Sequence, residues 1–222
     1  MLRIWGAVVA TMLAAALLAS PARAVTVDNL GIFGVQVTVT VAGYYGGPIN
    51  AGIDKLVVDG VAMDGFCIDP WHPVLATSTG YEFRDLALAP KPPGPMGATE
   101  AAEIAKLWAM AYSPTMSNKQ AAGLQIAIWE IVGGSNFSVI GKDCGASVLL
   151  ANLQNYSGPS ANLIALSGPG QDYVVLTPPS HFAENTPSTP DSGSTLLLSA
   201  MSFAAAILRR RAHKFSFALI QR

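Results

Sequence analysis

Side chains that bind metal ions are scarce in this chain of 222 residues, which contains two cysteines and three histidines. The histidines are far apart along the chain, and no cluster shows the short ligand spacing of a zinc site. A phosphate-binding glycine loop is also lacking, because Gly133-Gly134 follows an expected helix instead of preceding one. We therefore expect no metal centre, no nucleotide site and no cofactor.

Positive charge is scarce between the two ends of the chain. The segment 25–208 has six cations against 14 acidic residues, a net charge of −8 (6 minus 14), although the whole chain is at −1. Nucleic-acid binding needs cations that face the phosphates, so this balance argues against it and suits an extracellular domain. The six cations are Lys55, Arg84, Lys91, Lys106, Lys119 and Lys142.

The N-terminus has the pattern of a signal peptide over residues 1–24. Arg3 supplies a positive start, residues 4–20 are almost entirely apolar, and Ala22 and Ala24 stand where a signal peptidase needs small residues. We expect an exported protein whose mature chain begins at Val25. A retained membrane helix is the alternative interpretation.

The C-terminus has the pattern of a membrane anchor. Residues 180–194 are rich in Pro, Ser and Thr and indicate a linker, and an apolar segment within 195–222 follows. From 195 to 208 there are 14 residues, about 21 Å of helix against a hydrocarbon core of roughly 30 Å. This short span favours a transient transmembrane helix. A membrane stop with a cytoplasmic positive cluster follows it, formed by Arg209, Arg210 and Arg211.

The polar residues before this segment are Pro190, Asp191, Ser192, Gly193, Ser194 and Thr195. Together with the apolar segment and the arginines, they resemble the PEP-CTERM sorting signal of the VPDSGST type, with Thr189 where Val is usual. The resemblance covers the last 34 residues. It implies a Gram-negative-type bacterium with an exosortase-type processing enzyme that removes the tail. The segment 214–222 is longer than such tails often are.

The segment 25–179 is long enough for one hydrophobic core and one domain. Alternating β-branched residues predict strands over 25–27 and 34–41, and another over 55–62 with a bend at Asp59-Gly60. A further strand, ending at Ile68, carries Cys67.

Helical periodicity begins after the proline-rich loop 90–95. We expect a helix over 99–112, a second from Ser117 or Asn118 to Val132, and a third over 146–156. Short strands are expected over 137–140, 163–166 and 173–176. This order predicts an α+β fold, in which a sandwich- or barrel-like β scaffold carries an inserted helical hairpin with Gln125.

Gln125 lies on the apolar face of the second expected helix, one turn from Ala121 and Trp129, and is expected to point inward. A buried amide group left unpaired costs roughly 1–3 kcal/mol, so hydrogen bonds to neighbouring backbone are the ordinary interpretation.

Cys67 also has an apolar surround, in the segment Phe66-Cys67-Ile68-Asp69. With two cysteines in an exported chain, a Cys67–Cys144 disulfide is the ordinary expectation. This pairing belongs to an alternative function, a non-reactive structural or exopolysaccharide-associated surface protein.

Taken together, the two motifs resemble the thioester domains of bacterial surface adhesins. In that family an aromatic residue or Leu precedes a strand Cys, and a helix carries Gln with an apolar residue before it and Trp four residues later. Phe66-Cys67 and Leu124-Gln125 with Trp129 match in the same order, and the similarity covers about 42–137. The resemblance implies that Cys67 and Gln125 condense with loss of ammonia to a thioester. That bond then reacts once with an amine or hydroxyl on a target surface, so the chain is not expected to be an enzyme. Two features depart from the family, whose members carry sortase signals: the exosortase-like tail, and Cys144, left as a free thiol.

Three nearby residues are candidates for supporting roles. Trp129 could shield the bond from water or simply pack in the core, and Asp69 or His72 could transfer the proton of the attacking group or form an ordinary surface contact. A hydrolase that uses Cys67 with His72 is disfavoured, because only five residues separate them and no oxyanion-hole motif is visible. His181 falls in the linker and has no expected role.

Overall fold

The computed structural model describes residues 24–43, 45–92 and 94–179. The predictions of a signal peptide, a linker with a sorting motif, an arginine membrane stop and an idle His181 all lie outside the described residues. They stay predictions, as do the domain boundaries at 25 and 179. Within the described ranges, no helix is both long and apolar enough to cross a membrane.

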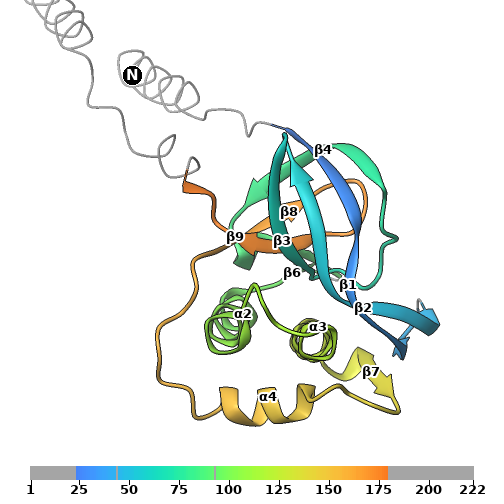
Figure 1. The fold of residues 1–222 in the computed structure, drawn as a ribbon, viewed down its shortest axis with the longest axis vertical. Coiled ribbons are helices and arrows are strands. Elements are labelled where there is room, and N and C mark those ends of the chain that lie inside the picture. The colour runs from blue at the N-terminus through green and yellow to red at the C-terminus, as the bar shows by residue number, and fades with distance from the viewer. Residues whose placement is uncertain (1–23, 44, 93, 180–222) are drawn as a thin grey trace, which may run out of the picture. The chain divides into compact units, whose positions relative to one another are not determined.

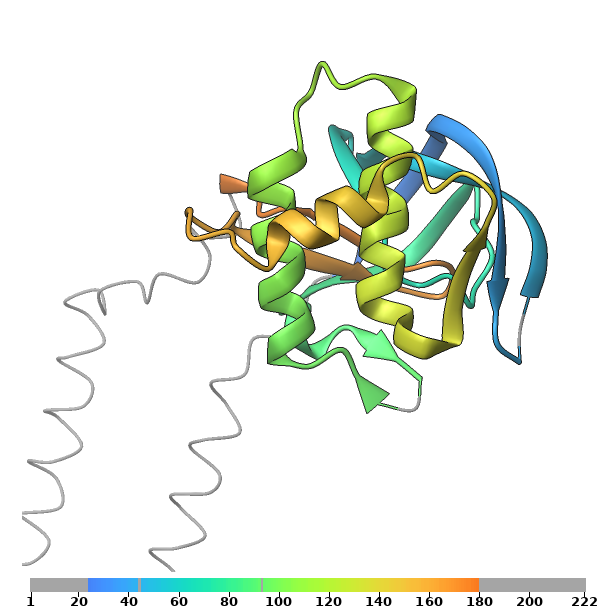
Figure 2. The same ribbon diagram turned by 90° about the horizontal axis from the view of Figure 1, so that it is seen from below.

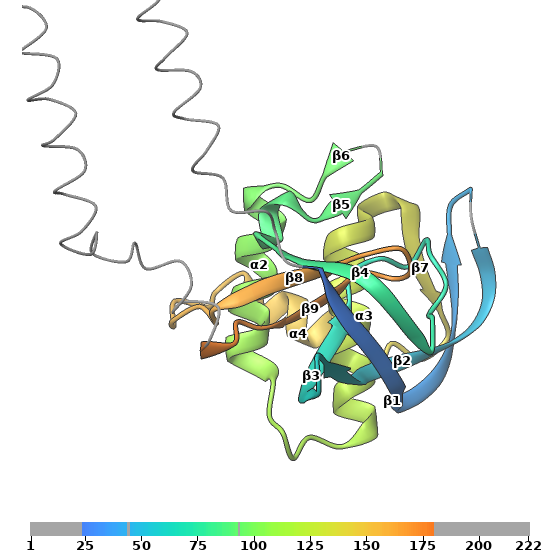
Figure 3. The same cartoon turned by 90° about the horizontal axis from the view of Figure 1, so that it is seen from above.

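Six antiparallel strands form a closed barrel, seen from two directions in Figures 1 and 3. Around the barrel they follow one another in the order β1 (Val25–Val41), β2 (Tyr45–Val58), β3 (Val61–Cys67), β9 (Tyr173–Leu176), β8 (Leu163–Ser167) and β4 (Thr77–Arg84), which pairs back to β1. The far end of β1 extends past the barrel, where β7 (Phe137–Ile140) pairs with it. The predicted barrel-like scaffold is therefore confirmed.

The structure corrects two strand predictions. The two strands expected over 25–27 and 34–41 are parts of one continuous strand, β1. A bulge between Asn29 and Ile32 shifts the register there without ending the strand. The strand expected over 55–62 is divided between two strands, because the bend predicted at Asp59-Gly60 is the turn between β2 and β3. Both turn residues have positive φ, 47° and 84°, as the tightest hairpin turns require.

The helices form two layers beneath the barrel. α2 (Ala98–Ala111) and α3 (Asn118–Gly133) lie side by side against one end of it, and α4 (Ala146–Leu153) crosses them on the outside (Figures 1 and 2). The expected helical hairpin is thus confirmed, and with it the α+β class. Short connections complete the chain: η1 (Leu86–Leu88), β5 (Pro90–Lys91), β6 (Gly94–Pro95) and η2 (Gly134–Asn136).

α3 is the central element of the helical layers. It begins with a capping box in which Ser117 and Gln120 bond each other's backbone N–H groups. Every residue from Ala121 to Trp129 is buried, because the barrel covers one side of the helix and α2 and α4 cover the others. A polar side chain in this stretch must find its partner inside the protein.

Candidate functional site

Cys67 is the last residue of β3, at the end of the barrel that α3 covers. On one side the ladder continues past it, because the Ile68 N–H donates to the Asp172 carbonyl at 3.0 Å. On the other side the register of β2 and β3 ends at the Asp54–Gly65 pair, before Cys67 is reached. The Cys67 peptide therefore presents backbone hydrogen-bonding groups toward α3.

The Gln125 carboxamide bonds to both of these backbone groups. The Cys67 N–H donates to Gln125 Oε1 at 2.8 Å, and Gln125 Nε2 donates to the Cys67 carbonyl at 2.8 Å. Because a backbone N–H can only donate and a carbonyl can only accept, these two bonds fix which way the amide faces. Its carbon, Cδ, is held opposite the Cα of the residue that carries the thiol. The structure thus brings Cys67 and Gln125 together.

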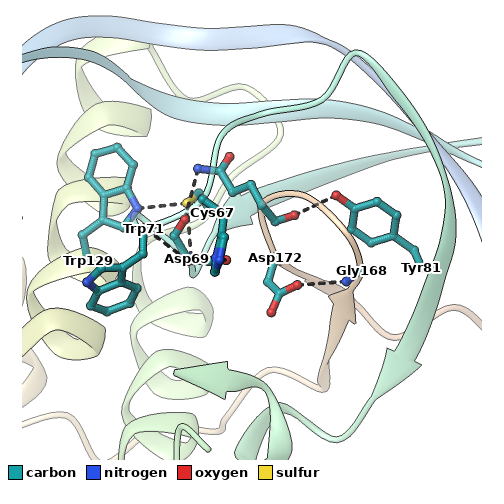
Figure 4. A network of polar contacts seen from close by, with 9 residues as sticks. Cys67, Asp69, Trp71, Tyr81, Trp129, Gly168 and Asp172 are labelled. Carbon is teal, nitrogen blue, oxygen red and sulfur yellow. Dashed lines mark hydrogen bonds and ion pairs between the residues drawn. The ribbon is translucent and has the colours of Figure 1, made fainter. Parts of the chain in front are cut away.

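The Cys67 sulfur receives two N–H groups (Figure 4). Trp129 Nε1 donates to Sγ at 3.2 Å, and the Asp69 backbone N–H donates at 3.3 Å. Trp129 is one turn from Gln125 on the same face of α3, so one helix face supplies both the amide and the indole. Cys67, Gln125 and Trp129 are 2%, 1% and 1% exposed, so the site is dry.

Burial raises the pKa of the Cys67 thiol well above its ordinary value, and the negative charges of Asp54 and Asp69 raise it further. The N–H groups of Trp129 and Asp69 act in the opposite direction but do not outweigh burial. The thiol therefore keeps its proton at physiological pH, and the sulfur is a neutral nucleophile next to a neutral amide.

Asp69 and His72 form a pair at the edge of the site. His72 Nδ1 lies 2.6 Å from Asp69 Oδ2, and the Trp71 backbone N–H donates to Asp69 Oδ1 at 3.1 Å. The Asp69 side chain is 5% exposed and that of His72 57%. Asp69 thus touches the sulfur through its backbone and an exposed imidazole through its carboxylate, and it connects the buried thiol with solvent.

Two further buried carboxylates lie near Cys67, and the sequence analysis missed both. Burial raises the pKa of Asp54 to about 7 and that of Asp172 to about 6. Asn29 Nδ2 donates to Asp54 Oδ1 at 2.8 Å and also to the Tyr173 hydroxyl at 3.1 Å. Asp54 could have been found from its phase, because it alternates with apolar Leu56 and Val58 on the inner face of β2.

The prediction of a Cys67–Cys144 disulfide is wrong for this structure, in which both cysteines are free. Cys144 lies just before α4, and its carbonyl would be 2.6 Å from a Cβ added at Gly123. Gly123 and Gln125 are about 200° apart around α3, so the helix itself stands between the two thiols. A disulfide needs Cα atoms within about 7 Å, which a helix between them does not allow.

We also searched the described part of the chain for a metal site and for a cavity. No group of three or more His, Cys, Asp or Glu in residues 24–179, gaps excepted, is arranged to hold a metal ion. A shallow cavity between α2, α3 and α4 is lined by residues such as Glu103, Lys106 and Glu130, not by Cys67 or Gln125.

No protein-family model matches this chain, and no curated protein matches it. Two solved structures resemble it. The thioester domain of the Staphylococcus aureus TIE protein is 14% identical at a TM-score of 0.44, over 71% of this chain and 79% of that one. The N-terminal thioester domain of a surface protein from Clostridium perfringens is 12% identical at 0.41, over 70% of this chain and 99% of that one. Because both the sequence identities and the TM-scores are low, the function proposed below rests on the contacts around Cys67 and not on these two structures.

Proposed function

We propose that Cys67 and Gln125 form an internal thioester through which the protein attaches covalently to a target. The Sγ–Cδ bond forms, the Cδ–Nε2 bond breaks, and the thiol proton leaves with the amide nitrogen as ammonia. The observation that carries the proposal is the double hydrogen bond that holds the Gln125 amide against the Cys67 backbone. Holding the reacting groups in place removes most of the entropy of their encounter.

The surrounding groups support this condensation. The Cys67 N–H already donates to Gln125 Oε1, the atom that becomes negative when sulfur adds to Cδ, and so acts as an oxyanion donor. The raised pKa of the thiol keeps available the proton that the departing nitrogen needs. Once the bond has formed, the buried Trp129 indole excludes water from it.

Release of the sulfur is the second step. An amine adds to Cδ, the C–S bond breaks, and a proton passes from the amine nitrogen to the sulfur, which leaves a thiol and an amide. Burial and the carboxylates disfavour a free thiolate here, so the bond is protected until the attacking group supplies that proton. We assign this transfer to His72, whose ring bonds Asp69, and a hydroxyl nucleophile would use the same route to give an ester.

In the cell, the proposed role is that of a covalent tether. Each thioester reacts once, so the protein binds and does not turn over substrate. The predicted signal peptide and sorting motif support an exported protein of the cell envelope or extracellular matrix, processed by an exosortase-type enzyme after transient anchoring. Its target is a surface nucleophile on a protein or an exopolysaccharide.

Intact mass of the purified exported domain tests the proposal. We expect a mass lower than that of the sequence by one ammonia, and uptake of one methylamine at Gln125 after incubation with the amine. A mass lower by two hydrogens and restored by a reductant would instead identify a disulfide and contradict the proposal, as would the full sequence mass without methylamine uptake.

The two cysteines provide a matched control. Cys67→Ala abolishes both the ammonia loss and methylamine uptake, whereas Cys144→Ala keeps both, because only Cys67 meets Gln125. Equal uptake by the two variants would rule out Cys67 as the thioester sulfur.

A further inference from the structure

Gln171 lies in the loop between β8 and β9, opposite Asp69 in the continued β3–β9 ladder. Its backbone is fixed on both sides. The Gln171 N–H donates to the Pro73 carbonyl at 3.1 Å, and the Tyr81 hydroxyl donates to the Gln171 carbonyl at 3.0 Å (Figure 4 shows Tyr81 in place). The side chain therefore starts from a rigid position, and little further entropy is lost when it binds something.

The Gln171 carboxamide is buried, with the residue 3% exposed, yet only half of its amide is used. Nε2 donates to the Asp69 carbonyl at 3.4 Å. Oε1 has no hydrogen-bond donor among the residues that the structure describes. An amide oxygen left in this state costs roughly 1–3 kcal/mol, so a donor that reaches it is bound favourably.

This oxygen belongs to a side chain that rests on the peptides holding the reactive sulfur. The Asp69 N–H donates to Cys67 Sγ, and the Asp69 carbonyl accepts from Gln171, so one residue links the two side chains. Asp69 also orients His72. Gln171 is thus linked to the sulfur through Asp69, the residue that also carries the proton-transfer pair.

We propose that Gln171 is a positioning residue whose Oε1 accepts an N–H from the attacking amine and directs the nitrogen lone pair at Gln125 Cδ. This inference rests on the proposed thioester. A primary amine has two N–H groups: one hydrogen-bonds to Gln171 and stays on the nitrogen, and the other proton ends on the Cys67 sulfur as the C–N bond forms and the C–S bond breaks.

The proposal makes Gln171 selective for nucleophiles that carry a hydrogen-bond donor. A primary amine has a second N–H to donate, whereas a hydroxyl must give up its single proton and a thiolate attacks with no hydrogen on its sulfur. Loss of the Gln171 acceptor should therefore slow attack by amines and leave thiol exchange at the same acyl carbon unchanged. A residue that only supports packing would not separate the two nucleophiles.

The experiment uses Gln171→Met, which keeps the length of the side chain and removes its acceptor. Thioester occupancy is read from intact mass before any nucleophile is added. Initial rates are then measured with methylamine and, separately, with ethanethiol. We expect full occupancy, a roughly tenfold loss of methylamine rate, as for one lost hydrogen bond, and an ethanethiol rate within twofold of wild type. Gln171→Glu retains an acceptor oxygen and should recover most of the methylamine rate.

Gln36→Met makes the same change at an exposed position on β1 and should alter neither rate. Equal loss of both rates in Gln171→Met, or loss of neither, would overturn the positioning role while leaving the thioester in place. If that variant forms no thioester, the comparison is made with Gln171→Asn, whose shortened amide withdraws the acceptor and should show the same selectivity. A wild-type protein without ammonia loss would overturn the thioester and this role together.

Discussion

The two cysteines lie on opposite sides of one helix, and their surroundings differ in kind. Cys67 meets the face of α3 that carries Gln125 and Trp129, whose side chains bond to its peptide and to its sulfur. Cys144 lies near the Gly123 face, where its backbone approaches closely and it has a positive φ of 54°. The surroundings of Cys67 are thus defined by side-chain hydrogen bonds, and those of Cys144 by the close approach and conformation of its backbone.

The difference shows what makes a thiol a candidate for acyl chemistry. Proximity to α3 is common to both cysteines, so it does not distinguish them. What distinguishes Cys67 is a carboxamide that takes the place of a missing strand neighbour and two N–H groups on the sulfur. We expect changes on the Cys67 side to alter chemistry and changes on the Cys144 side to alter only stability.

The largest effect is expected from Gln125→Glu. A carboxylate has no ammonia to release and is a poor acyl donor, so the thioester should not form and methylamine uptake should fall below detection. Gln120→Glu is the matched control on the same helix, because Glu at this position also completes a capping box with Ser117. Intact mass checks both variants, and ammonia loss in the Gln125 variant would contradict the assignment of the acyl group.

His72→Gln should lower the rate of methylamine uptake by roughly 100-fold, the usual contribution of a positioned proton-transfer group. Ammonia loss in the resting protein should persist, since His72 bonds Asp69 and not the sulfur. His181→Gln serves as the control, and an unchanged rate of methylamine uptake in His72→Gln would exclude the proton-transfer role.

Asp54→Asn should stabilise the protein at pH 8 by up to about 4 kcal/mol, because its pKa is raised from 3.8 to about 7 and each pKa unit is worth about 1.4 kcal/mol. The folded-state pKa of Asp54, about 7, lies above the ordinary value of 3.8 for an aspartate, so the folded protein holds this proton more tightly. Stability of the wild type should therefore fall as pH rises from ~4 to ~7, and the gain in the variant should be absent at pH 4 and complete above pH 7. Urea denaturation at several pH values measures it.

Asp143, beside Cys144, supplies the opposite case. Hydrogen bonds from the Ser147 side chain and backbone and from the Gly145 backbone lower the pKa of Asp143 to about 2. Its contribution to stability is therefore present above pH ~4 and lost as pH falls toward 2, so Asp143→Asn should weaken the protein at neutral pH and not at pH 2. If the effects of the Asp54 and Asp143 substitutions on the free energy of unfolding changed with pH in the same direction, the contrast between the two cysteine environments would be contradicted.

Trp129→Phe should slow methylamine uptake roughly tenfold, because it keeps an aromatic ring over the site but removes one N–H from the sulfur. Trp108→Phe is the control. Trp108 lies on α2, and its ring centroid is 5.2 Å from that of Phe66, so this substitution should alter packing without changing the rate. Equal rates for the wild type and the Trp129 variant would mean that the N–H of Trp129 has no effect on the reaction and that the ring only excludes water.

Much of this site could be predicted from the sequence because its two principal residues lie in strongly periodic segments. Gln125 falls on the apolar stripe of a well-capped helix, and Cys67 ends a strand before Asp69-Pro70, so both positions follow from local patterns. The disulfide prediction was wrong because the number of cysteines carries no information about a helix between them.

Other parts of the site depend on long-range pairing, which a local pattern does not contain. Gln171 reaches Asp69 only because β9 pairs with β3 across more than 100 residues of chain. β4 was missed because Thr77 to Arg84 has a weak alternation and is ordered by its neighbours β1 and β8. The expected strands over 163–166 and 173–176 marked the hairpin, but nothing local marked Gln171 as a partner of Asp69.

The smallest effect is expected on the other side of α3, from Cys144→Gly. A side chain at φ 54° carries backbone strain of about 1 kcal/mol that glycine relieves, partly offset by the greater freedom of glycine in the unfolded chain. We expect a net gain of about 0.5 kcal/mol in urea denaturation, with Cys144→Ala giving none. Methylamine uptake should be the same in both variants, since neither touches the carboxamide. A different rate of methylamine uptake in either variant would mean that Cys144 influences the acyl bond through α3. The contrast between the two thiols would then fail.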